Sequence, residues 1–273
     1  MTTRKFAAYA VMTGAMVCGS GAALLFAYFL IAGPVTAGRA SFSNVERLGW
    51  DTLLSLLFFG MHSLMIRRTV RSRLTRLIPE HYYPAVYAII SGIILFLVVL
   101  LWQPSEDVWI RLEGRLAWLP RGISLLAVGG FIWTVRSLRA LGAFDLVGRR
   151  AIRAYLRGRS ARPTRLLIRG PYRHVRHPLY ALMVVLLWST PVVTSDRMLL
   201  NVLWTGWIIA GTWLEERDLA IEFGAAYREY QRAVPMLVPW RRARLTEDDL
   251  PDAAAEKLAR MESGASIVNV AAD

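Results

Sequence analysis

Cysteine is the scarcest residue in this chain: Cys18 is the only one among 273 residues. A single cysteine excludes an intrachain disulfide and a metal site built from several thiolates. No Gly-x-Gly-x-x-Gly motif follows a predicted strand, so the signature of a dinucleotide-binding Rossmann domain is absent. The sequence also has no internal repeat and no low-complexity tract.

Charge is nearly missing from six long stretches, and 55% of all residues are hydrophobic, too many for an ordinary soluble domain of this length. The stretches lie at about residues 6–32, 49–66, 84–102, 122–141, 179–193 and 198–214. Stretches of this kind predict membrane-spanning helices, although the last two are slightly short for a ~30 Å core. The first could instead be a signal peptide, but it is longer than a usual signal core, which favours a retained helix.

The positive charges are concentrated between these stretches. The net charge is +13, from 33 Lys+Arg against 20 Asp+Glu, and such a balance could indicate nucleic-acid binding. The basic segments, however, follow every second apolar stretch, as the positive-inside rule requires. We therefore expect no nucleic-acid partner. The predicted fold is an all-α integral membrane protein with about six transmembrane helices and both termini in the cytoplasm, in a bacterial inner membrane.

The segments around the helices complete this prediction. Aromatic residues flank the loop after the third stretch as an interfacial belt would, namely Trp102, Trp109 and Trp118. After the sixth stretch, apolar residues at helical spacing predict a cytosolic amphipathic helix that stops before Pro235. We expect three parts: the first four transmembrane helices in 1–145, a second part with the last two helices in 146–240, and a mobile tail in 241–273.

Two short motifs border the last two apolar stretches. Arg176-His177-Pro178 stands before the fifth stretch, where proline fits the first turn of a helix and the free amides favour an anion. Glu215-Glu216 ends the sixth, and adjacent helical residues point about 100° apart. One carboxylate could hold a ligand and the other an arginine, such as Arg217 or Arg173. The alternatives are a helix cap with basic membrane anchors and a solvated helix end.

Together these motifs carry a family resemblance over residues 166–240. Gly170-Pro171-Tyr172, Arg176-His177-Pro178-Leu179-Tyr180, Glu215-Glu216 and Phe223-Gly224-x-x-Tyr227-x-x-Tyr230 resemble the C-terminal half of the isoprenylcysteine carboxyl methyltransferase-like membrane family. The resemblance implies S-adenosylmethionine as cofactor, bound without a Rossmann domain. It implies a cofactor site with these residues: Tyr172, Arg176, His177, Pro178, Tyr180, Glu215, Glu216, Tyr227 and Tyr230.

The resemblance also implies roles within that site. Glu216, with Glu215, would hold the amino or ribose groups of the cofactor. Arg176 and Arg173 would pair with its carboxylate, and we count Arg173 among the catalytic candidates. Tyr227 and Tyr230 would close the pocket on the cytosolic side.

The upstream half is similar to the subgroup that contains NnrU-type proteins and methanethiol S-methyltransferase. The similarity lies in Phe59-Gly60-Met61-His62, Trp102-Gln103-Pro104 and Phe144-Asp145-Leu146, while Ala143 and Ala151 replace a histidine and a glutamine of that pattern. His62 could orient the acceptor or take its proton, or simply bond a neighbouring helix. Asp145 could be a second catalytic element on the acceptor side or form an ion pair with Arg149 or Arg150.

Three functions fit this sequence. The first is S-methylation of a small thiol such as methanethiol, and the second is methylation of a prenylcysteine carboxylate or a phospholipid. The partners would then be the thiol or lipid acceptor and the surrounding membrane lipids. The third is a non-enzymatic NnrU-like membrane protein that keeps the fold without turnover.

Overall fold

The computed structural model describes residues 3–35, 37–38, 40–140, 145, 147–159, 166 and 168–241. Contacts between residues group the chain into two compact units. Unit 1 comprises Met1–Pro163 and Leu182–Ile208, and unit 2 comprises Thr164–Ala181 and Ile209–Asp273. The expected C-terminal tail, from residue 242 onward, lies outside the described residues, as does Ala143.

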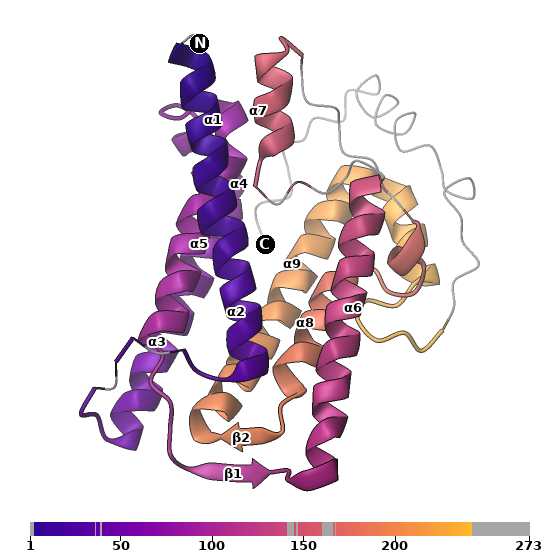
Figure 1. Cartoon of the computed structure of the whole chain (residues 1–273). Coiled ribbons are helices and arrows are strands. Elements are labelled where there is room, and N and C mark those ends of the chain that lie inside the picture. The colour runs from indigo at the N-terminus through magenta and orange to yellow at the C-terminus, as the bar shows by residue number, and fades with distance from the viewer. Residues whose placement is uncertain are drawn as a thin grey trace, which may run out of the picture. The chain divides into compact units, whose positions relative to one another are not determined.

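The described part of the chain is mostly helical (Figure 1). Its helices are α1 (Thr3–Ala15), α2 (Gly21–Ala32), α3 (Asn44–Ile66), α4 (Arg68–Leu74), α5 (Tyr83–Leu101), α6 (Trp118–Ala140), α7 (Arg149–Leu156), α8 (Pro178–Trp188) and α9 (Ser195–Ala233). A π-helical turn, Met16–Ser20, joins α1 to α2 without interrupting the helix. Strands β1 (Val108–Arg111) and β2 (Val192–Thr194) form an antiparallel ribbon in unit 1.

Four helical segments within the described residues are long and apolar enough to cross a membrane: Arg4–Ala32, Asn44–Ile66, Glu80–Leu101 and Gly114–Arg139. They correspond to the first four predicted stretches, which confirms a mostly helical protein with four candidate membrane-spanning helices among the described residues. The fifth predicted stretch forms α8, whose 11 residues reach about 16 Å at 1.5 Å per residue. That is about half of a ~30 Å hydrocarbon core.

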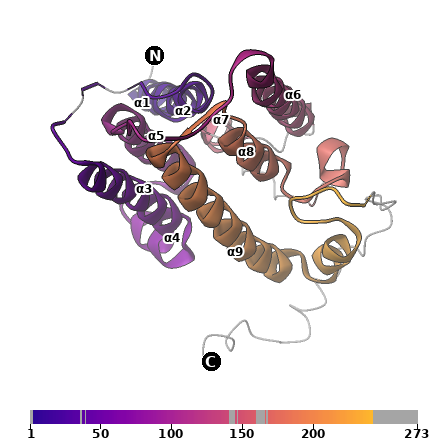
Figure 2. The same cartoon turned by 90° about the horizontal axis from the view of Figure 1, so that it is seen from below.

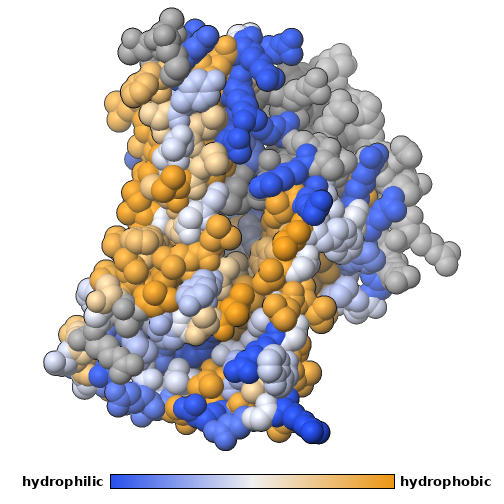
Figure 3. All heavy atoms as spheres, in the orientation of Figure 1, coloured by the Kyte–Doolittle hydropathy of each residue, from blue (hydrophilic) through white to orange (hydrophobic). Residues whose placement is uncertain are grey.

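In unit 1, α5 lies between α1–α2 and α3 (Figures 1 and 2). The core of this unit is aromatic. Phe26 stacks on Trp204 with ring centroids 4.5 Å apart, and Phe59 stacks on Trp207 at 4.7 Å. Many large apolar side chains of α2 and α6 remain exposed, and Figure 3 shows the apolar surface that they form. An apolar surface around an apolar core is the pattern of a helix bundle in lipid.

The loops of unit 1 are tied down by buried polar groups. Trp102 is fully buried and donates from Nε1 to Asp196 at 3.0 Å, so its predicted place in an interfacial belt is wrong. Trp109 and Trp118 are exposed as that prediction requires. The amide of Gln103 donates to Asp51 at 2.9 Å, so two carboxylates fix the chain directly after α5.

The crossing of α5 with the π-helical turn is extremely close at Gly92. A Cβ atom built on this residue would lie 2.3 Å from the carbonyl oxygen of Cys18. Such a distance is far below van der Waals contact, and the obstacle is backbone rather than a flexible side chain. Only glycine therefore permits this packing.

We predict that Gly92→Ala destabilises the protein by about 1–3 kcal/mol, the usual cost of overpacking a core. The measurement is thermal unfolding of the purified protein in detergent. Gly129→Ala is the control, because a Cβ at Gly129 in α6 meets nothing within 4 Å. Equal melting temperatures for the two variants would contradict this packing.

Unit 2 has its own small core. It consists of Ile168, Phe223, Tyr227, Tyr230 and Val234, with Leu166, Leu219, Ala220 and Ala233 packed around them. These residues confirm the predicted apolar periodicity after Glu216. The helix is interrupted at Gly224, where φ is 59° and ψ is −130°, a conformation that glycine tolerates. Figure 2 shows that the last part of α9 turns away from the axis of the preceding part.

Candidate functional site

Segments far apart in the sequence meet within unit 2 around the Arg-His-Pro motif. Pro178 is the first residue of α8, so the motif stands directly before the helix, as predicted. The amides of Arg176 and His177 donate to the carbonyls of Pro235 and Met236 at 2.9 and 3.1 Å. These bonds hold the motif against the chain that follows α9.

The two adjacent glutamates of α9 have different surroundings. Glu216 is buried, with 7% of its surface exposed, whereas the side chain of Glu215 is 44% exposed. This is the divergence expected for consecutive helical residues. The two carboxylates therefore cannot do the same work.

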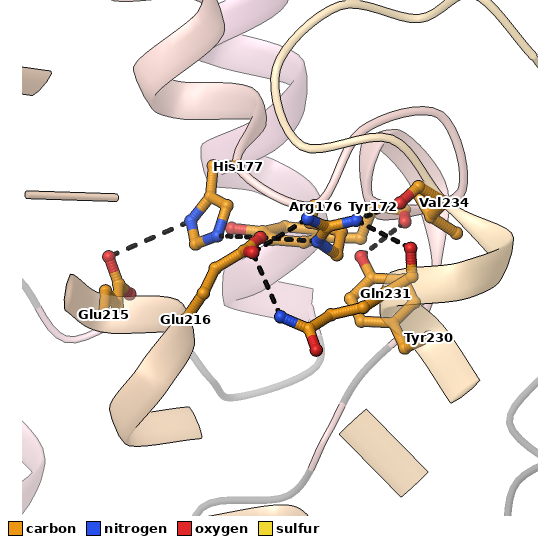
Figure 4. A network of polar contacts seen from close by, with 8 residues as sticks. All are labelled: Tyr172, Arg176, His177, Glu215, Glu216, Tyr230, Gln231 and Val234. Carbon is orange, nitrogen blue, oxygen red and sulfur yellow. Dashed lines mark hydrogen bonds and ion pairs between the residues drawn. The ribbon is translucent and has the colours of Figure 1, made fainter. Parts of the chain in front are cut away.

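Glu216 is the centre of a polar network (Figure 4). Arg176 binds its carboxylate with two nitrogens, Nε to Oε1 at 2.5 Å and Nη2 to Oε2 at 2.8 Å. His177 Nε2 lies 3.2 Å from Oε1, and Gln231 Nε2 donates to Oε2 at 3.1 Å. The arginine that the glutamate pair holds is thus Arg176, not Arg217 or Arg173 as the sequence suggested.

The same arginine also reaches the end of α9. Its Nη1 donates to the carbonyl of Gln231 at 3.0 Å and to the carbonyl of Val234. A planar guanidinium can serve a carboxylate and two carbonyls at once because its five donors lie in a fixed fork. Arg176 therefore links the residues before α8 to α9 on both sides of the break at Gly224, through Glu216 before it and Gln231 after it.

The network determines the ionisation of Glu216. Burial alone would raise the pKa of this carboxyl. The hydrogen bonds from His177 and Arg176, the charge of Arg176 and the bond from Gln231 outweigh burial and lower the pKa to about 2. Glu216 is therefore ionised at neutral pH, and its charge stabilises the folded unit.

We predict a characteristic pH dependence for this stabilisation. The folded pKa lies below the ordinary value of 4.5, so the contribution of Glu216 is complete above that pH and is lost as the pH falls towards about 2. Glu216→Gln should cost about 3 kcal/mol near neutral pH, as for a broken buried pair. The difference from the wild type should shrink in acid.

Melting temperatures measured over a pH series check this prediction. Glu215→Gln is the matched control, since its side chain is largely exposed and should leave stability nearly unchanged. A constant difference between Glu216→Gln and the wild type across the acid range would contradict the ionised network.

The tyrosines of the site support the network in different ways. The Tyr230 hydroxyl donates to the carbonyl of Tyr172 at 2.7 Å. The Tyr227 hydroxyl is buried and has no hydrogen-bond partner among the described residues. Burial raises the pKa of Tyr172 to about 12, with a smaller effect from the charge of Glu215, and burial likewise raises the pKa of Tyr227. These phenols therefore stay protonated at neutral pH.

The more exposed candidates lie at the edge of this arrangement. Tyr180 is 39% exposed and its ring stacks on that of His177, with centroids 5.6 Å apart. His177 Nδ1 lies 3.8 Å from Glu215 Oε2. Arg173 donates to the carbonyl of Ile168 at 3.4 Å. Glu215, Tyr180 and Arg173 are thus the groups with surface available to a ligand.

The chain matches a known protein family over most of its length. The model described as "NnrU protein" matches residues 52–234, well over half of the sequence. This chain belongs to the NnrU family. All candidate site residues, including His62 and Asp145, lie inside the matched region.

Curated relatives of this NnrU-family chain carry informative names. It is 32% identical over 253 residues to methanethiol S-methyltransferase 2 of Bradyrhizobium diazoefficiens, which covers 89% of this chain and 95% of the relative. It is 34% identical over 203 residues to methanethiol S-methyltransferase of Pseudomonas sp., covering 70% and 73%. It is also 28% identical over 183 residues to Nurim of Sus scrofa, covering 63% and 68%. No solved structure matches it significantly. The predicted resemblance is therefore confirmed.

Two candidates of the NnrU-family chain belong to unit 1. His62 lies in α3, where its Nε2 is 2.7 Å from the hydroxyl of Tyr87 and its ring contacts Phe58 and Trp207. Asp145 accepts from the amides of Arg149 and Arg150, at 2.7 Å each. Asp145 therefore caps the first turn of α7 through these backbone amides. The sequence had suggested an ion pair with the guanidinium group of one of the two arginines instead. Ala151 is part of α7 itself.

Sequence reasoning missed two partners in the network. Gln231 supplies a side-chain donor to Glu216 and a carbonyl to Arg176, and Val234 supplies a second carbonyl. Gln231 stands four residues after Tyr227, so the helical period places both on one face. Backbone carbonyls carry no sequence signal of this kind.

Proposed function

We propose that this chain is an integral membrane methyltransferase that uses S-adenosylmethionine and methylates a small thiol such as methanethiol. The observation that carries this proposal is the similarity to a methanethiol S-methyltransferase over 89% of the chain. The buried Arg176–Glu216 network at the motif typical of such enzymes supports it.

The proposal includes a topology and a division of the chain. Six crossings would place both termini in the cytoplasm of a bacterial inner membrane. The fifth would consist of α8 and the non-helical residues that lead from it to β2, and the sixth of the first part of α9. Residues 1–145 would form the first four transmembrane helices, residues 146–240 the methyltransferase core with the last two, and residues 241–273 a mobile tail. The distribution of basic segments supports this orientation.

The residues of unit 2 fit the chemistry of the proposed cofactor. S-adenosylmethionine has an ammonium and a carboxylate, which require charged partners, and a ribose, which requires hydrogen bonds. The exposed carboxylate of Glu215 suits the ammonium or ribose, and Arg173 suits the carboxylate. Tyr227 has a buried hydroxyl with no partner among the described residues. Glu216 has its oxygens occupied by three side chains, so we assign it to positioning His177 and Arg176.

Four further residues would line the proposed cofactor pocket, namely Tyr172, Pro178, Tyr180 and Tyr230. Pro178 begins α8 and thereby presents His177 at the helix mouth. Tyr230 fixes the backbone of Tyr172 through its hydroxyl. Their task in the proposal is to shape and close the pocket rather than to react.

The reaction needs little acid–base chemistry. S-adenosylmethionine supplies, when bound, a methyl group on a positively charged sulfur. The acceptor thiol must lose its proton and approach in line with the bond that breaks, so this chain's work is binding, orientation and proton removal. We propose His62 as the group that orients the thiol or accepts its proton. Arg173 and Asp145 are further catalytic candidates.

We predict that His177→Ala and Glu215→Gln weaken S-adenosylmethionine binding at least tenfold. His177→Ala removes the ring at the helix mouth, and Glu215→Gln removes the exposed charge. Equilibrium binding to purified protein in detergent checks this, with thermal unfolding as the control for folding. Cofactor affinity unchanged in both folded variants would defeat the proposed site.

We further predict that His62→Gln lowers the rate of thiol methylation by at least tenfold and leaves cofactor affinity unchanged. General-base catalysis typically contributes this much or more. The rate should recover in part at high pH, where the thiol ionises without help. Tyr87→Phe is the companion variant, because it removes only the hydroxyl that bonds His62. An unaltered rate in His62→Gln would exclude a role in the reaction.

A phospholipid or prenylcysteine acceptor is the main alternative. Product analysis in native membranes with a labelled methyl donor distinguishes it, because the label would then appear in lipid or in a methyl ester. Cofactor binding without transfer to any acceptor would instead favour a non-enzymatic NnrU-like protein.

A further inference from the structure

Helix α7 of unit 1 has two contrasting faces. Its inner face carries Ile152, which is completely buried in a cluster with Ala8 and Met12 of α1 and Ala85 of α5. Its outer face carries Arg150, Arg153 and Arg157, all exposed. Their spacing of three and four residues places them on one side of the helix.

This helix is held firmly in its orientation. Asp145 caps its first turn through two backbone amides. Near its other end, Tyr155 stacks on His81 with centroids 3.5 Å apart, and the guanidinium of Arg4 lies 3.9 Å over the same ring. At its start, Gly148 has φ 68°, and a Cβ there would lie 2.7 Å from the amide of Ala85. The outer arginines therefore present a fixed surface.

The position of α7 within unit 1 relates this surface to the membrane. It packs against the first turns of Arg4–Ala32 and of Glu80–Leu101, two segments apolar enough to span a bilayer. The ends of spanning helices lie at the level of the lipid headgroups. In Figure 3, hydrophilic atoms gather over α7 beside α1, and apolar atoms cover α2.

Asp145, the carboxylate that contacts Arg150, accepts from its backbone amide. Among the described residues, no carboxylate forms an ion pair with Arg150, Arg153 or Arg157, whereas Arg71 of the same unit pairs with Glu80 at 3.1 Å. The sequence contains no acidic residue from Leu146 to Ser195. A guanidinium that is not used in an ion pair with a carboxylate is well suited to bind a phosphate through two parallel hydrogen bonds.

We propose that the outer face of α7 binds the phosphate headgroups of anionic phospholipids. Lipid binding at this face does not depend on the proposed methyltransferase activity. A lipid fits better than a soluble acidic macromolecule because α7 packs on two segments apolar enough to span a bilayer, near the ends where headgroup and acyl chain would meet. Bound lipid would stabilise α7 and the helices that it contacts.

The test compares lipids by thermal unfolding of the full-length protein in a non-ionic detergent. Phosphatidylglycerol should raise the melting temperature several degrees more than phosphatidylcholine. The triple variant R150Q/R153Q/R157Q should lose this additional shift. The matched control R111Q/R115Q/R121Q removes three exposed arginines of β1, the following turn and α6, and should keep it.

Several outcomes would overturn the proposal. An undiminished phosphatidylglycerol shift in the α7 variant would show that the lipid acts elsewhere. A shift of the same size with inorganic phosphate would indicate a site for free anions. Stabilisation by a soluble polyanion, such as polyglutamate or an RNA oligonucleotide, without any effect of phosphatidylglycerol would assign the face to an acidic macromolecule.

Discussion

The ion pair between Arg176 and Glu216 is the interaction on which unit 2 depends. A buried carboxylate is costly unless it is paired and hydrogen-bonded, and here three side chains from two directions satisfy it. The pair joins the residues before α8 to α9, and the carbonyls that Arg176 binds extend this link to the end of α9. One charge pair therefore fixes the place of His177, whose ring stands at the mouth of α8.

The division of labour between the two glutamates follows from this constraint. Glu216 is saturated and buried, whereas Glu215 is exposed beside His177. A motif of two identical residues thus supplies one structural carboxylate and one that is available to a ligand. The helical rotation of about 100° between neighbours makes this separation unavoidable.

The sequence predicted much of this arrangement because its strongest patterns are local. Apolar stretches predicted the four helices that are long and apolar enough to span a membrane. The His-Pro pair predicted the start of α8, and the spacing of Phe223, Tyr227 and Tyr230 predicted the buried face of α9. It failed where a contact joins distant residues. The arginine predicted to pair with the glutamates was the wrong one, and the contribution of Gln231 was missed. Trp102 is buried and hydrogen-bonded to Asp196, not exposed at a membrane interface. Pairing over such separations depends on how the chain folds back, which periodicity does not encode.

The central claim is that the chain transfers a methyl group to a small thiol. The most direct measurement incubates the purified protein with S-adenosylmethionine labelled in its methyl group and with methanethiol, and follows the volatile product. We expect the label to appear in dimethyl sulfide at a rate that depends on the enzyme. Label that remains entirely in the cofactor, or that enters only membrane lipid, would contradict the claim.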